Sequence, residues 1–143
     1  MARAPQRRVV ARPVSRPERL SASERGYDHR WSSVTAPAIR ERDGWLCQEC
    51  LRKGGLAQAM AEMMSRPLVG CQKCRGRNSS RCPLCLGSGK HARQPPVDHK
   101  IPGHVCGPAK FHDPDNLEVL CDEHNAKKRE ADILQYGPPP LWK

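Results

Sequence analysis

Eight cysteines and six histidines are the residues of this 143-residue chain whose types and spacing could do chemistry. Four half-sites share a spacing of two intervening residues, and these are Cys47/Cys50, Cys71/Cys74, Cys82/Cys85 and Cys121/His124. Two intervening residues let one tight turn present both side chains to a single tetrahedral ion. Four such half-sites within one short chain predict two structural Zn²⁺ sites.

The second and third half-sites are close enough in sequence to close a four-cysteine site of their own. This site would contain Cys71, Cys74, Cys82 and Cys85. The run Cys82-Pro-Leu-Cys85-Leu-Gly-Ser-Gly resembles the CxxCxGxG repeat of the DnaJ-type zinc-binding region, and we interpret it as a zinc-binding hairpin without chaperone function. The long-range site is then left with Cys47, Cys50, Cys121 and His124. A redox CxxC is the rival interpretation, but no βαβ pattern accompanies any pair.

Asp98, His99 and Asn116 lie between the two halves of the long-range site. An oxygen ligand, a base with a pKa near neutrality and an orienting amide are the groups that a metal-dependent phosphodiesterase needs. Taken singly, Asp98 could be a turn residue, His99 a surface histidine and Asn116 a cap. His104 and His112 have no position in a motif, and Cys106 is left over as a bystander.

The order of these groups resembles the HNH endonuclease family, which has the ββα-metal fold. That pattern is CxxC, an Asp-His pair, Asn-Leu-x-x-Leu-Cys and a helix with the last ligands, and it covers residues 23–50 and 95–130. The resemblance implies that His99 is the general base and Asp98 a catalytic metal ligand. It also implies that Asn116 holds the strands and the base in position, and that the products carry 5′ phosphates. The run 27–31 resembles the lead-in of phage HNH proteins encoded near packaging genes, which suggests a phage terminase as a partner.

The chain departs from the family at the start of its last helix. Where the family usually has Leu-Cys-x-x-Cys-His, this chain has Leu-Cys-Asp-Glu-His-Asn over residues 120–125. The resemblance then implies that His124 is the fourth zinc ligand and that Asn125 joins Asp98 on a catalytic Mg²⁺ or Mn²⁺. HNH domains of CRISPR effector nucleases have a similar Asp-His, Asn and Asn arrangement. In an alternative register His124 is the catalytic ligand and the zinc lacks one partner.

The charge of the chain favours a polyanionic partner, and nucleic acid comes first. Lys and Arg exceed Asp and Glu by ten, and the sequence pI is about 9.6. We expect contacts with double-stranded DNA from six basic residues, which are Lys100, Lys127, Lys128, Arg7, Arg8 and Arg12. No stretch approaches the roughly 20 apolar residues of a membrane span, and no signal-peptide core is evident, so we expect a cytoplasmic protein without a membrane partner.

The composition is too poor in apolar residues for a large single-core enzyme, because only 37% of residues are hydrophobic. We expect a small zinc-stabilised α+β protein in which a ββα-metal core carries N-terminal helices and an inserted four-cysteine hairpin. Its four regions would be a basic disordered arm (1–22), a helical region with the first zinc knuckle (23–65), the zinc insertion (66–92) and the catalytic region (93–143). The alternatives are a non-catalytic zinc-containing nucleic-acid-binding protein and a redox or chaperone-like cysteine protein.

The elements that must position these groups are short. Tyr27 and Trp31 have the spacing of one helical face, and helices are predicted over 37–42, 56–64 and 122–136. The three methionines of the second helix (Met60, Met63 and Met64) indicate packing. Strands are predicted over 97–101 and 117–120, with a long loop between them. We expect Asp98 and His99 at a strand end, because Pro102 and Gly103 interrupt the extended chain.

Overall fold

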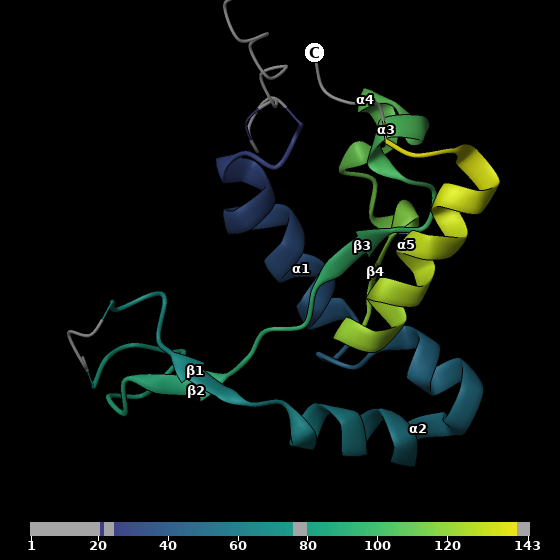
Figure 1. The fold of residues 1–143 in the computed structure, drawn as a ribbon. Helices are drawn as coiled ribbons and strands as arrows, with labels where there is room; N and C mark the ends of the chain where they lie inside the picture. Colours follow the sequence, from purple (N-terminus) through teal and green to yellow (C-terminus); the bar gives the residue numbers. More distant parts are fainter. Residues whose placement is uncertain (1–20, 22–24, 76–79, 140–143) are drawn as a thin grey trace, which may run out of the picture.

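The computed structural model describes residues 21, 25–75 and 80–139, so the basic arm with Arg7, Arg8 and Arg12 lies outside the described residues. It is an α+β structure with two small antiparallel sheets (Figure 1). In order along the chain, the elements are η1 (Trp31–Thr35), α1 (Ala36–Arg42), α2 (Gln48–Ser65), β1 (Leu68–Gly70), β2 (Lys90–Ala92), β3 (Val97–His99), α3 (Gly103–Cys106), α4 (Pro108–Phe111), η2 (Pro114–Asn116), β4 (Leu117–Val119) and α5 (Asp122–Tyr136). Among the described helices, none combines the length and apolarity needed to cross a bilayer.

The β3–β4 pair lies between α1 and α5 (Figure 1). The antiparallel register places Asp98 opposite Glu118 and His99 opposite Leu117. The apolar core beneath this sheet is small, with Ile39, Leu117 and Val119 buried and packed against Trp31 and Val97. A core of this size needs additional ties between elements.

Polar side chains supply some of these ties between the N-terminal helices and β4. Arg42 donates to the carbonyls of Pro114 and Leu117, both at 2.7 Å. Asp43, at the end of α1, accepts a hydrogen bond from the backbone N–H of Val119 at 2.9 Å. The strand is therefore anchored by side chains that come from more than 70 residues earlier in the chain.

The β1–β2 pair forms a separate hairpin that projects from the rest of the molecule (Figure 1). Leu68 pairs with Ala92, and the backbone N–H of Arg93 closes the base of the hairpin by donating to the Pro67 carbonyl at 2.8 Å. Its far end carries a cluster of buried cysteines. The hairpin thus has its own sheet and its own small core.

Several predicted elements agree with the structure. The helices expected over 37–42 and 122–136 are α1 and α5, and both strands are present, although each has only three residues. The loop between the strands contains three short helices that the sequence did not indicate. Asp98 and His99 are the last two residues of β3, as predicted. The rings of Tyr27 and Trp31 are in contact at 5.0 Å, although Tyr27 lies in the turn before the helix and not on its face.

The helix predicted over 56–64 is present as the second part of the longer helix α2, but its methionines are not all packed as expected. The helix runs from Gln48 to Ser65, because its first turn begins at the cysteine pair, and it kinks at Gly55, where φ is 73°. The methionines were expected to pack, yet Met60 is 42% exposed and Met64 is 80% exposed. Good helix formers set the helix here, but no other element of the described structure covers that face.

Candidate functional site

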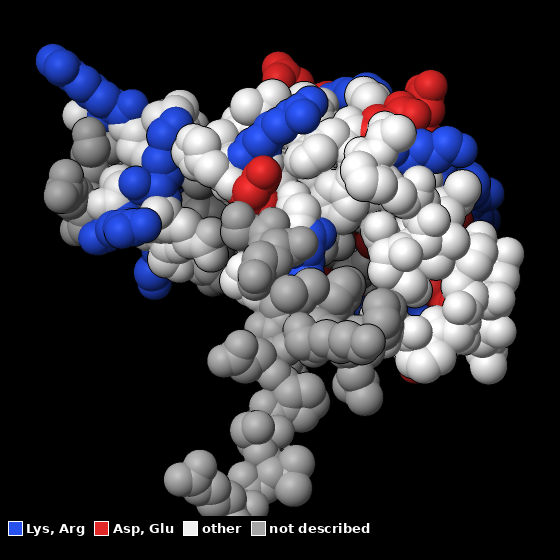
Figure 2. Space-filling model, turned by 90° about the horizontal axis from the view of Figure 1, so that it is seen from above, with Lys and Arg blue, Asp and Glu red and all other residues white. Residues whose placement is uncertain are grey.

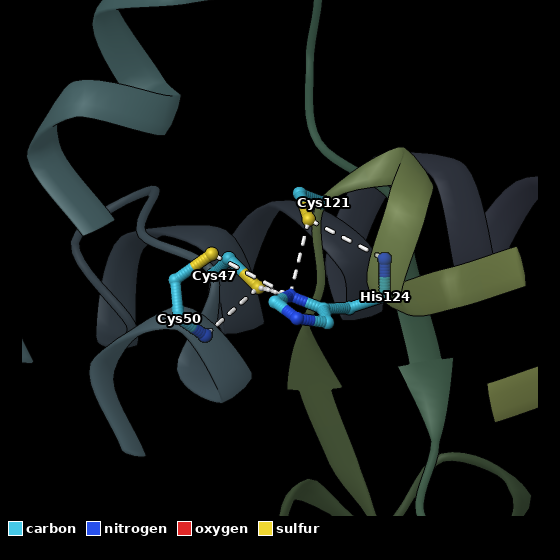
Figure 3. A group of neighbouring side chains, drawn as sticks. All are labelled: Cys47, Cys50, Cys121 and His124. Carbon is cyan, nitrogen blue, oxygen red and sulfur yellow. Dashed lines mark hydrogen bonds between the residues drawn. The ribbon is translucent and has the colours of Figure 1, made fainter. Parts of the chain in front are cut away.

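The long-range half-sites come together in one buried cluster (Figure 3). The ligand atoms of Cys47, Cys50, Cys121 and His124 all lie within 4.8 Å of one another. The Nδ1 atom of His124 is 3.4 Å from the Cys47 sulfur, 3.5 Å from the Cys50 sulfur and 3.3 Å from the Cys121 sulfur. A tetrahedral zinc ion with ordinary Zn–S and Zn–N bonds requires N–S separations of about 3.6 Å. The cluster therefore has nearly the dimensions of a zinc site.

Both halves of this cluster begin a helix. Cys47 is the N-cap of α2 and its sulfur accepts from the N–H of Cys50, while Cys121 is the N-cap of α5 and accepts from the N–H of His124, both at 3.4 Å. Donation from backbone N–H groups and the positive end of the helix dipole both favour a thiolate over a thiol. The spacing of two residues therefore places the second ligand of each pair in the first turn of its helix.

Without a cation, this cluster of sulfurs resists ionisation. Burial, reinforced by the neighbouring Cys47 thiol, raises the pKa of Cys50 to about 12. A divalent ion would remove that penalty by compensating the thiolate charges. The donor set of three sulfurs and one imidazole nitrogen suits Zn²⁺.

The hairpin contains the second cluster, formed by Cys71, Cys74, Cys82 and Cys85. Its sulfurs are 3.7 Å apart between Cys71 and Cys82 and 3.5 Å apart between Cys74 and Cys85. Four thiolates around a zinc ion lie about 3.8 Å apart. The structure thus confirms that the four half-sites assemble into two four-residue clusters that could each hold zinc.

Each of the two cysteine knuckles of the hairpin is followed by the same kind of backbone turn. Arg75 donates its N–H to the Cys71 carbonyl, and Leu86 donates its N–H to the Cys82 carbonyl. Both donors have left-handed backbone angles, with φ of 45° at Arg75 and 51° at Leu86. Gly87 follows with φ of 89°, a conformation that favours glycine. This turn explains the glycine that follows the Cys82/Cys85 pair.

An open cleft of about 950 Å³ lies beside the β3–β4 sheet. Asp98 from β3 and Asn125 from α5 both line it, and these are two of the residues predicted to hold a catalytic cation. Their carboxylate and amide oxygens are the hard donors that Mg²⁺ and Mn²⁺ prefer. Asn125 is next to His124 in the sequence, but the two side chains lie at different sites. Asn125 lines the cleft, whereas His124 belongs to the cysteine cluster.

His99 lies buried next to this cleft, with only 1% of its surface exposed. Its ring stacks on Trp31, with centroids 5.1 Å apart and planes 19° apart, and it contacts Phe111 at 4.4 Å. Its Nε2 lies 2.9 Å from the Phe111 carbonyl oxygen. Because a carbonyl can only accept, Nε2 carries the proton and Nδ1 keeps the lone pair of a base. Burial lowers the pKa of His99, which favours this neutral form.

The side chain of Asn116 forms hydrogen bonds with the backbone of the loop that follows His99. Its Oδ1 accepts from the N–H of Ile101 at 2.9 Å, and its Nδ2 donates to the carbonyls of Ile101 at 3.2 Å and Lys110 at 3.3 Å. These bonds join the start of β4 to both ends of the 101–110 loop. A role of Asn116 in positioning His99 stays a prediction.

Two groups beside Asp98 have surroundings that the sequence did not indicate. Lys128 lies 3.5 Å from an Asp98 oxygen and also pairs with Asp132, so this lysine is held between two carboxylates. Burial raises the pKa of Tyr27, and the nearby Asp98 adds to that effect. A spacing of four residues on α5 is a signal for the Lys128–Asp132 pair. No local pattern indicated that Tyr27 lines the cleft or that Asp98 contacts Lys128.

The other predicted residues have varied surroundings. His104 is exposed at the cleft, and His112 lines it while sharing a 2.7 Å hydrogen bond with Thr35. Lys100 is exposed, and Lys127 pairs with Glu123 at 2.8 Å. Cys106 lies outside both clusters, as expected of a bystander.

Searches against protein-family models, curated proteins and solved structures find no match to this chain.

Proposed function

We propose that this protein is a zinc-stabilised HNH-type endonuclease that hydrolyses phosphodiester bonds of double-stranded DNA. The observation that carries the proposal is the juxtaposition at the cleft. Asp98 and Asn125 line it from β3 and α5, and His99 lies next to it, with Nε2 bonded to the Phe111 carbonyl. The order of strand, strand and helix, with the base at the end of the first strand, is the order that the HNH resemblance implies.

In this proposal the Nδ1 atom of His99 accepts the proton of an attacking water. Its fitness for this role comes from the Phe111 carbonyl, which fixes the tautomer, and from burial, which lowers its pKa. Trp31 and Phe111 hold the ring in one orientation, so little reorganisation is needed when the water arrives. Asn116 supports the same loop through its three backbone hydrogen bonds.

Asp98 and Asn125 are the residues that would hold a divalent cation in the cleft. Such a cation supplies positive charge against the phosphate and the departing 3′ oxygen. Lys128 would contact a phosphate once a cation replaced it beside Asp98. The positive net charge of the chain supports a polyanionic substrate. A phage origin and a packaging terminase as partner remain part of the proposal on the sequence resemblance alone.

The test is cleavage of a supercoiled plasmid with Mg²⁺ or Mn²⁺ added to protein from which loosely bound metal has been dialysed. Dialysis is preferable to EDTA, because a chelator would also remove the structural zinc. We expect cleavage by the wild type, and loss of cleavage in His99→Ala and in Asp98→Ala at unchanged zinc content. The matched control is His29→Ala, since His29 is exposed and its ring bonds only to Ser33 among the described residues.

A wild-type chain that binds DNA but never cleaves it would support the runner-up, a non-catalytic zinc-containing nucleic-acid-binding protein. Equal cleavage by His99→Ala and the wild type would overturn the assignment of the base.

A further inference from the structure

The four-cysteine hairpin has no part in the proposed chemistry, yet it carries an unusual concentration of charge. Residues 63–97 include seven Lys and Arg and no Asp or Glu. Four thiolates with one Zn²⁺ would contribute two negative charges, which leaves the segment strongly positive. In Figure 2, blue side chains gather over the end of the molecule that the hairpin forms, with no red ones among them.

Two of these charges pair with carboxylates within the described residues, and three others do not. Arg66 is committed to Glu62 in a well-packed ion pair at 2.6 Å, and Arg93 lies 3.5 Å from Asp122 with both side chains more than half exposed. Lys73, Arg75 and Lys90 are exposed and form no ion pair with a carboxylate within the described residues.

The segment that joins the hairpin to β3 is short and is fixed by hydrogen bonds to the main body. Five residues separate Ala92 at its base from Asp98, and they include two consecutive prolines. Arg40 donates to the Pro95 carbonyl at 2.9 Å, and the N–H of Leu120 donates to the Pro96 carbonyl at 3.1 Å. A connection of this length spans at most about 20 Å, or about six base pairs of duplex. One DNA molecule can therefore reach both the cleft and the hairpin.

We propose that the hairpin is a second binding element for duplex DNA, which contacts backbone phosphates to one side of the cleavage position through Lys73, Arg75 and Lys90. This inference rests on the proposed function for the identity of the partner. Lysine and arginine on a rigid turn recognise phosphates without reading bases. The contribution of the hairpin should therefore be independent of sequence and strongly dependent on salt.

The experiment measures binding of a fluorescein-labelled duplex of about 30 base pairs by anisotropy over a range of KCl concentrations, without added divalent metal. Each of Lys73→Gln, Arg75→Gln and Lys90→Gln should lower the magnitude of the salt slope by about 0.9, and the triple variant by about 2.7. The matched control is Lys53→Gln, which removes a charge that is also exposed, but on α2, where it pairs with Glu49. Zinc content and melting temperature should be unchanged, because none of these side chains belongs to a metal cluster.

Hairpin variants with the same slope as Lys53→Gln would overturn the inference, and so would an effect seen with single-stranded RNA but not with the duplex. The two proposals fail separately. If the wild type cleaves plasmid but the hairpin variants keep the wild-type salt slope, only the hairpin inference is wrong. If the hairpin variants lower the salt slope but the wild type never cleaves plasmid, only the proposed nuclease activity is wrong.

Discussion

Arg52 on α2 and Glu118 on β4 form a two-pronged ion pair across 66 residues of sequence. The two nitrogen–oxygen distances are 2.9 Å and 3.2 Å, and the Glu118 side chain is only 9% exposed. Glu118 faces Asp98 across the sheet, so this pair joins the helix that begins at the first zinc half-site to the strand beside the cleft.

Glu118→Gln should destabilise the fold by about 1–2 kcal/mol, because it replaces two charge-assisted bonds at a nearly buried position. The exposure of the Arg52 side chain keeps the effect at the low end. Urea unfolding followed by circular dichroism measures it. Lys53→Gln is the control, since it disturbs only an exposed helical pair and should change the free energy of unfolding by no more than about 0.5 kcal/mol. Equal effects of the two variants would contradict this assignment.

The two metal clusters should respond differently to mutation. His124→Ala should lower the zinc content from two ions to one and abolish cooperative unfolding, because a structural zinc is worth about 10 kcal/mol, as much as the stability of a typical domain. Cys82→Ser should also remove one zinc but leave the unfolding of the remaining chain nearly intact, because the hairpin has its own core. Elemental analysis and thermal melts of both variants test this. Global unfolding of Cys82→Ser would show that the hairpin is not independent.

Asn125 separates the two registers that the sequence left open. If it helps to hold the catalytic cation, Asn125→Ala should reduce cleavage by at least about 100-fold at normal zinc content and stability, since even partners of metal ligands are worth about 10–100-fold. Asn125→Asp and Asn125→His should both retain activity, because each restores a donor at that position. The position of His124 within the cysteine cluster favours this register. Full activity of Asn125→Ala, together with a folded but inactive His124→Ala, would favour the other.

The absence of a side chain at Gly103 is predicted to be necessary for the position of the His99 ring, the proposed base. A Cβ atom there would lie 2.8 Å from the Phe111 ring and 3.5 Å from the Cε1 atom of His99. Gly103→Ala should therefore cost about 1–3 kcal/mol and lower cleavage, as overpacked sites do. Gly70→Ala is the matched control, because a Cβ at that position meets nothing within 4 Å. Thermal melts and plasmid cleavage compare the two, and wild-type activity in Gly103→Ala would contradict a tightly packed His99.

The metal clusters were predictable from the sequence because ligand spacing is a local property. Cys47 and Cys121 each cap a helix, and a spacing of two residues fits the first turn of a helix as well as a hairpin knuckle. The surroundings of His99 were not predictable in the same way. Its contacts with Trp31 and Phe111 come from separate segments, and side chains that meet through tertiary packing leave no periodic signal.

The exposed face of α2 shows the opposite limit. Met60 and Met64 have high helix propensity, and propensity determined the helix correctly. Whether a helical face is covered depends on which elements lie next to it, and the spacing of apolar residues alone could not establish that for Met64.

The closed base of the hairpin has a consequence for how this chain tolerates change in length. Cys50 and His124 are 74 residues apart, and the segment 66–92 lies entirely between them. The entropy lost on closing a loop rises only with the logarithm of its length, so adding this segment makes the long-range cluster harder to close by only about 0.4 kcal/mol. Because the N–H of Arg93 meets the carbonyl of Pro67, the chain leaves the main body and returns to it at adjacent points. The hairpin can therefore be lengthened, replaced or deleted in this chain while the geometry around Asp98 and His99 is kept.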